Sequence, residues 1–103
     1  MAGYGQMMKQ MNKLQRDMEK KQAELDAREF VKSANAGMIT ITAMGNKEIK
    51  SITIADEMMT VEDKELLEDM LILAVNDLIK EIEEVSEKEL GKLTNGMKMP
   101  GLF

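Results

Sequence analysis

The sequence has no cysteine, no histidine and no tryptophan, and only one proline, one tyrosine and two phenylalanines. Without cysteine the chain forms no disulfide, no thiolate nucleophile and no zinc–thiolate site. Without histidine, general acid–base chemistry falls to carboxylates, lysines and Tyr4. Long apolar runs are also lacking: the longest, residues 70–75, is far below the roughly 20 residues of a membrane span. The N-terminus has no apolar signal-peptide core. These absences predict a soluble, cytoplasmic, single-domain protein with no cofactor, no metal and no membrane partner.

The remaining chemistry-bearing residues do not form a catalytic pattern. Glu83 and Glu84 are sequence neighbours, which do not face each other on a helix. No calcium-loop spacing is present. Gly3 and Gly5 do not continue into a phosphate-binding loop, because Met8 stands where the third glycine belongs. We therefore expect no enzyme and no small-molecule substrate.

Charge is distributed unevenly along the chain. The net charge is −5, which by itself argues against a nucleic-acid partner. Residues 1–32, however, carry seven basic and five acidic side chains, whereas residues 54–90 carry three basic and thirteen acidic ones. The acidic excess is confined to one segment, and both ends of the chain are basic.

The N-terminal segment repeats apolar residues at alternating steps of three and four. This pattern predicts a long amphipathic helix over about residues 6–28, with coiled-coil character. Its apolar seam consists of Tyr4, Met7, Met11, Leu14, Met18 and Leu25. Methionines at helical spacing indicate core or dimer seam more often than an adaptable binding surface, which stays the alternative.

The middle and the end of the chain predict three strands and a second helix. Strands are expected within residues 30–54, with Ile39, Ile41 and Ala43 on one face and turns at residues 35–37 and 44–47. Thr60 and Asp63 have the form of a capping box, so a helix is expected over about residues 61–90 with Gly91 as its C-cap. Residues 91–103 are expected to be irregular. The fold class is α+β: an antiparallel meander flanked by two long helices, in the order α-β-β-β-α.

The apolar surface of the two helices exceeds what so small a sheet can cover. Helices of about 23 and 30 residues are roughly 35 and 45 Å long, whereas three six-residue strands make a sheet roughly 20 Å long. The excess predicts a homodimer. The alternative is that the two helices pack on each other within one chain. The predicted dimer seam consists of Met7, Met11, Leu14, Met18, Leu71 and Leu78.

A basic stripe lies opposite the apolar seam of the first helix. Its members, spaced four, three and four residues apart, are Lys9, Lys13, Arg16 and Lys20. Two copies in a dimer would present eight cations, an arrangement suited to DNA phosphates. The alternative is an ordinary solvated face, in which Asp17, Glu19 and Glu24 pair with these cations. No aromatic side chains are interleaved, which argues against stacking on single strands.

The whole chain resembles the YbaB/EbfC family of bacterial nucleoid-associated proteins. The resemblance lies in residues 7–15, 63–70, 74–78, 82–84, 94–97 and 100–103, and residues 63–84 are its most specific part. It implies an α-β-β-β-α fold, a tweezer-shaped homodimer with projecting terminal helices, and double-stranded DNA as partner. It also implies low or variable sequence specificity and a role in nucleoid organisation or gene regulation. Carried onto this sequence, the DNA contacts are Lys9, Lys13, Arg16 and Lys20, with Lys88 and Lys92 as further candidates.

Two other functions remain open at this point. The acidic bulk, with a pI near 4.8, favours a coiled-coil-like protein-interaction module that makes no direct DNA contact. A basic amphipathic first helix can also lie on a membrane surface, but that helix has no Trp or Phe to insert.

Overall fold

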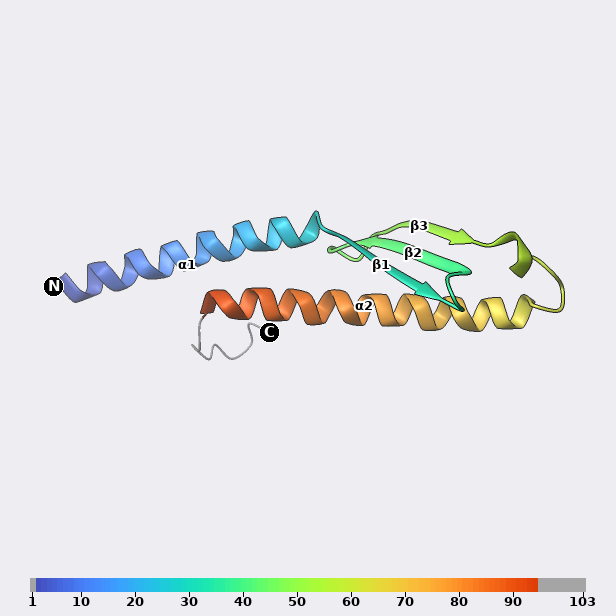
Figure 1. Ribbon diagram of the computed structural model, residues 1–103. Coiled ribbons are helices and arrows are strands. Elements are labelled where there is room, and N and C mark those ends of the chain that lie inside the picture. Colours follow the sequence, from blue (N-terminus) through green and yellow to red (C-terminus); the bar gives the residue numbers. More distant parts are fainter. Residues whose placement is uncertain (1, 95–103) are drawn as a thin grey trace.

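The computed structural model describes residues 2–94, and its secondary structure follows the predicted order. Helix α1 (Ala2–Asp26) leads into strands β1 (Glu29–Ala34), β2 (Ile39–Met44) and β3 (Ile49–Ile54). A short 3-10 helix, η1 (Asp56–Met58), and helix α2 (Lys64–Thr94) follow. The molecule is elongated, measuring 73 × 21 × 17 Å, with α1 and α2 antiparallel (Figure 1).

The three strands form an antiparallel sheet in the order β1-β2-β3, as the sequence predicts. The β1–β2 turn places Asn35, Ala36 and Gly37 at positive φ, between 52° and 86°. In the β2–β3 turn the Asn46 Oδ1 accepts a hydrogen bond from the Glu48 N–H at 2.9 Å. The register of β2 and β3 shifts between Thr42 and Ala43, which is a β-bulge. Both predicted turns are therefore confirmed.

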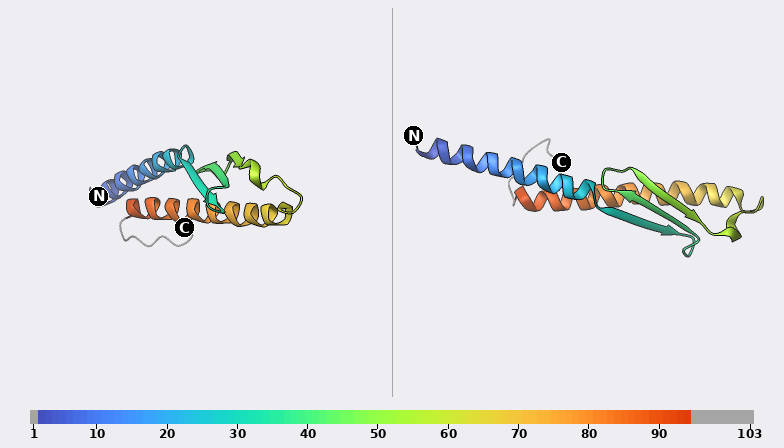
Figure 2. Two further views of the ribbon diagram at one scale, coloured as in Figure 1. Left: turned by 45° about the vertical axis from the view of Figure 1, so that its right-hand side comes forward. Right: turned by 90° about the horizontal axis from the view of Figure 1, so that it is seen from above.

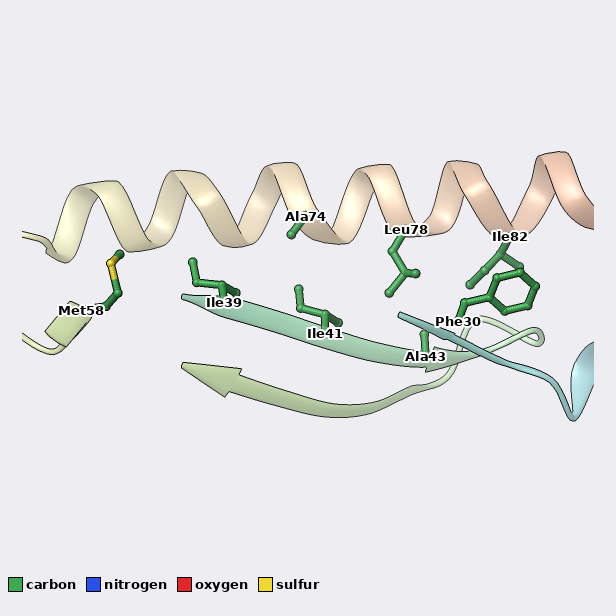
Figure 3. Close-up of a cluster of buried hydrophobic side chains, with 8 residues drawn as sticks. All are labelled: Phe30, Ile39, Ile41, Ala43, Met58, Ala74, Leu78 and Ile82. Atoms are coloured by element: carbon green, nitrogen blue, oxygen red, sulfur yellow. The ribbon is translucent and has the colours of Figure 1, made fainter. Parts of the chain in front are cut away.

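The core lies between one face of the sheet and α2 (Figure 3). Strand β2 alternates buried and half-buried residues, with Ile39, Ile41 and Ala43 pointing to α2, as its period-two pattern predicts. Helix α2 packs against β1 and β2 but leaves the outer strand β3 largely uncovered. The cluster of buried side chains comprises Phe30, Ile39, Ile41, Ala43, Met58, Ala74, Leu78 and Ile82.

The ends of α2 differ from the prediction. The predicted hydrogen bond of the capping box is present, because the Thr60 Oγ1 accepts the Asp63 N–H at 3.1 Å. The regular helix begins only at Lys64, however, so Thr60 lies in the turn before the helix and is not its N-cap residue. Gly91 does not end the helix, which continues to Thr94, so the predicted C-cap is wrong. The hydroxyl of Thr94, which is buried, donates to the Gly91 carbonyl oxygen at 2.8 Å. A glycine inside a helix costs only about 1 kcal/mol, which packing of this last turn offsets. The remainder of the predicted irregular tail, residues 95–103, lies outside the described residues.

Candidate nucleic-acid interface

Helix α1 is an arm attached to the rest of the chain at its C-terminal end. Both figures of the whole chain show its N-terminal half lying beyond the end of α2 (Figures 1 and 2). The apolar seam becomes progressively uncovered in that direction: Leu25 is fully buried, Met11 is 55% exposed and Tyr4 is 68% exposed. The alternative to a homodimer, in which the two helices pack on each other within one chain, therefore holds only for the last turns of α1.

A glycine permits the close attachment of this arm to the sheet. A Cβ built on Gly45, in the β2–β3 turn, would lie 1.7 Å from the carbonyl oxygen of Leu25. The Gly45 N–H donates to the Arg28 carbonyl oxygen at 2.9 Å, just after α1 ends. On the other side of the seam, Lys21 Nζ lies 3.7 Å from a carboxylate oxygen of Glu89 on α2. These contacts fix where the arm leaves the body of the molecule.

The predicted basic stripe lies on the exposed side of this arm. Lys9, Lys13, Arg16 and Lys20 are all exposed, on the face of α1 opposite the seam that contacts α2. At 1.5 Å per residue they cover about 16 Å of helix length. Double-stranded DNA carries one phosphate charge per roughly 1.7 Å of its axis, so several phosphates fall within that length. The structure therefore brings the four cations together in one row.

The neighbouring acids form no ion pair with the stripe among the described residues. The Glu19 carboxylate accepts a hydrogen bond from Gln15 Nε2 at 3.4 Å, and Glu24 pairs with Lys21 at 3.6 Å. Within the part of the chain that the structure describes, none of the four stripe cations forms an ion pair within 4 Å. The local pairing that would make this an ordinary solvated face is not formed.

The two further candidates on α2 do not join the stripe. Lys92 Nζ lies 3.8 Å from a Glu89 carboxylate oxygen, and Glu89 is also the partner of Lys21. Lys88 is exposed. Because the seam of α1 faces α2, the arm itself stands between the stripe and these lysines. Within one chain, therefore, Lys88 and Lys92 belong to a separate surface.

The predicted dimer-seam residues fall into three environments. Met7 and Met11 are more than half exposed, and Leu14 and Met18 are half-buried beside the end of α2. On α2, Leu71 is half-buried against the core. The sixth residue, Leu78, is 0% exposed because it packs into the chain's own core, so its prediction as a dimer residue is corrected here.

The body carries an uncovered apolar surface that the seam prediction missed. Ile49 and Ile52 on β3 are 40% and 48% exposed, since α2 packs mainly against β1 and β2. On α2, Ile72 and Leu73 are 62% and 51% exposed. The sequence signal for this surface was the apolar character of α2 on nearly all sides, which indicates a helix covered on more than one side.

Two other kinds of site are absent from residues 2–94. No helix there is both long and apolar enough to cross a lipid bilayer. No group of three or more potential metal ligands comes together in that range.

Comparison with known proteins gives consistent relatives over nearly the full length. Residues 1–97 match the profile of the YbaB/EbfC DNA-binding family. A nucleoid-associated protein of Alkaliphilus metalliredigens is 48% identical over 97 residues, which cover 94% of this chain and 85% of that protein. A nucleoid-associated protein of Desulforamulus reducens is 47% identical over 102 residues, which cover 99% of this chain and 97% of that protein.

A solved structure supports the fold. The crystal structure of an uncharacterized protein from Helicobacter pylori aligns with a TM-score of 0.75 at 20% identity, covering 89% of this chain and 97% of that one. The α-β-β-β-α architecture is thus seen in an independent molecule. The profile match and the sequence identity to these relatives show that the chain belongs to the YbaB/EbfC DNA-binding family.

Proposed function

We propose that this protein is a nucleoid-associated, double-stranded DNA-binding homodimer that contacts phosphates through the basic stripe of α1. The observation that carries the proposal is the exposed row of four unneutralised cations on an arm that projects from an acidic body. Family membership and the relatives named as nucleoid-associated support it and favour it over a protein-interaction module without DNA contact.

The charge distribution explains how a protein of net charge −5 binds a polyanion. Residues 54–90, which include most of α2, carry thirteen of the 19 acidic side chains. The stripe lies on the outer face of α1, which carries only two acidic residues, Asp17 and Glu19, up to Lys20. Coulomb interactions between exposed charges are largely screened beyond about 8 Å at physiological ionic strength. DNA that lies along α1 therefore interacts mainly with the four cations. Repulsion by the acidic body disfavours binding of DNA elsewhere on the protein.

The contacts expected from this stripe carry little sequence information. Lysine and arginine on phosphate oxygens fix the position of a protein on the duplex, whereas sequence is recognised through base edges in the grooves. Low sequence specificity and a strong dependence on salt follow, since each neutralised phosphate releases counterions. Such binding fits a role in nucleoid organisation or in broad gene regulation, and it assigns the chain no catalytic step.

The homodimer is supported by the apolar surface that one chain leaves uncovered. Ile49, Ile52, Ile72 and Leu73 place four large side chains on the body at 40–62% exposure. Removing large apolar side chains from water stabilises an association in proportion to the area buried. A second copy covering these side chains would bring two arms, and eight stripe cations, into one particle. The arms would then grip one duplex or bridge two.

The test is a titration of a labelled random-sequence duplex, followed by fluorescence anisotropy at low and near-physiological salt. The variant Lys13→Glu/Arg16→Glu reverses two stripe cations. The variant Lys64→Glu/Lys80→Glu makes the same change of net charge on exposed positions of α2. We expect a large loss of affinity for the first variant and a small one for the second. Equal losses would mean that net charge alone governs DNA affinity. No DNA binding even at low salt would mean that any nucleoid role depends on a protein partner that binds DNA.

A further inference from the structure

The N-terminal part of α1 has a composition that phosphate contacts alone do not explain. Residues 2–16 contain no acidic side chain, and all 19 acids lie elsewhere in the chain. Four side-chain amides do lie there: Gln6, Gln10, Asn12 and Gln15. An amide adds no charge toward phosphates, but it places a hydrogen-bond donor beside an acceptor. Adenine presents the complementary pair in the major groove of DNA.

One of these amides, Asn12, lies beside the basic stripe on the side of α1 that faces away from α2. It follows Lys9 by three residues and precedes Arg16 by four, so both cations are its neighbours on the helix surface. Around the helix, Asn12 lies about 70° from the middle of the stripe. Lys21, which pairs with Glu89 of α2, is about two and a half turns further along and therefore on the opposite side of α1. DNA that contacts Asn12 thus approaches from the side away from the acidic helix.

Asn12 makes no contact that would explain its presence in this helix. It is exposed near the middle of the 25-residue α1. Among residues 2–94, no hydrogen bond joins its side chain to another residue, whereas Gln15 donates to Glu19 at 3.4 Å. Asparagine is also a weaker helix former than glutamine, lysine or alanine. The residue therefore lowers the helix propensity of α1 without a described contact in return, which indicates a contact with a partner.

Met8 lies one turn before Asn12 on the same side of the helix. Its side chain is 41% exposed, and both residues line the same shallow groove along α1. In the major groove, an A·T pair presents the N7 acceptor and N6 donor of adenine beside the O4 and the methyl group of thymine. An amide and an apolar side chain about 6 Å apart along one helix match the two ends of this pattern.

We propose that Asn12 and Met8 are specificity-determining residues that contact A·T base pairs in the major groove, while the stripe holds the phosphates beside them. The inference rests on the DNA-binding role proposed above and adds a base contact to it. An α-helix of about 10–12 Å diameter fits a major groove about 12 Å wide. This part of α1 extends beyond the end of α2 (Figures 1 and 2), so α2 does not block its entry. The expected result is a preference for A·T pairs of about tenfold, added to the sequence-independent affinity.

Base analogues that change only the major-groove edge test the contact. Anisotropy titrations compare an A·T-rich duplex with the same duplex containing 7-deazaadenine, which lacks the N7 acceptor but keeps the phosphates and the minor groove. We expect the wild-type protein to bind the analogue several-fold more weakly. Asn12→Ala should bind the natural duplex several-fold more weakly and lose no further affinity on the analogue. Gln15→Ala is the matched control, because it removes a neighbouring amide that is bonded to Glu19, and it should respond to the analogue as the wild type does.

Uracil in place of thymine tests Met8 in the same way, because it removes only the methyl group from the major-groove edge. The wild-type protein should lose up to about fourfold in affinity on the uracil duplex, the value of one buried methyl group. Met8→Ala should show no further loss on that duplex. An equal loss for Met8→Ala and the wild type would exclude Met8 from the contact.

The outcomes separate the base contact from phosphate binding. Lys13→Glu/Arg16→Glu should weaken binding to the natural and the 7-deazaadenine duplex alike. If the wild-type protein binds both duplexes equally, with a steep dependence on salt, the base contact is refuted and the DNA-binding proposal stands. If it binds neither duplex at low salt, both proposals fail. If Asn12→Ala is as sensitive to the analogue as the wild type, another residue contacts the adenine and the assignment of Asn12 is wrong.

Discussion

Gly45→Ala tests whether the arm is fixed by the contact between the end of α1 and the β2–β3 turn. The added methyl group would lie 1.7 Å from the Leu25 carbonyl oxygen and 2.6 Å from its carbonyl carbon. Ordinary van der Waals contacts of a Cβ begin near 3.4 Å. The obstacle is backbone and not a flexible side chain, so no rotamer change relieves the clash. The end of α1 must move outward by more than 1 Å or detach.

The expected loss in the free energy of unfolding follows from the contacts that this movement disrupts. It separates the Gly45 N–H from the Arg28 carbonyl oxygen, now 2.9 Å apart, and it uncovers Leu25, which is fully buried. Overpacking of a close contact costs about 1–3 kcal/mol. For a chain of this size, a loss of about 2 kcal/mol lowers Tm by roughly 10 °C. We expect a loss in this range, together with weaker DNA binding, because the stripe is carried on the displaced helix.

Thermal unfolding followed by circular dichroism measures the effect at one fixed protein concentration, since association shifts Tm. Gly5→Ala is the control: it makes the same substitution on α1 itself, where the added methyl group has nothing within 4 Å. Inside a helix this control is expected to stabilise by up to about 1 kcal/mol. If Gly45→Ala changed the free energy of unfolding by less than about 0.5 kcal/mol, the contact would not be what anchors the arm.

Two further predictions concern the turn before α2 and the proposed dimer surface. Thr60→Ala removes the side-chain acceptor of the Asp63 N–H and should cost about 1 kcal/mol in chemical denaturation, the net contribution of one hydrogen bond. Val61→Ala next to it, at an 88% exposed position, should cost almost nothing, and equal losses in the two variants would argue against a contribution from this hydrogen bond. Ile72→Glu places a charge on an exposed apolar position of α2. If the proposed dimer uses this surface, the variant should be monomeric in analytical ultracentrifugation with unchanged helix content. A dimer that persists at the same protein concentration would exclude this surface as the interface.

Most of the fold follows from periodicity. The steps of three and four that end at Leu25 predict α1, and the alternation of Ile39, Ile41 and Ala43 predicts the buried face of β2. Helix η1 was not predicted, because three residues are too few to show a period, although Met58 within it is buried in the core. Periodicity also does not show whether an apolar face is covered by the same chain or by a partner. Leu78 therefore looked available for a partner, whereas its own sheet covers it.

The site was predictable in its spacing but not in its electrostatic state. The positions of Lys9, Lys13, Arg16 and Lys20 follow from helical geometry alone. Whether these cations form ion pairs depends on which basic side chain each carboxylate contacts, because several lie at suitable helical spacing. In the structure, Glu24 pairs with Lys21. The separation of Lys88 from the stripe depends on how α1 packs on α2, which neither helix encodes by itself.

The salt dependence of DNA affinity tests the central claim most directly. For a protein that neutralises phosphates, the logarithm of the binding constant falls linearly with the logarithm of salt concentration, with a slope of about −0.9 per phosphate. We predict that replacing Lys9, Lys13, Arg16 and Lys20 by alanine one after another reduces the steepness of this slope by about 0.9 per chain at each step. Lys64→Ala and Lys80→Ala should leave the slope unchanged. A slope that stays constant through the stripe series would contradict the account, because the four cations would then not touch the phosphates.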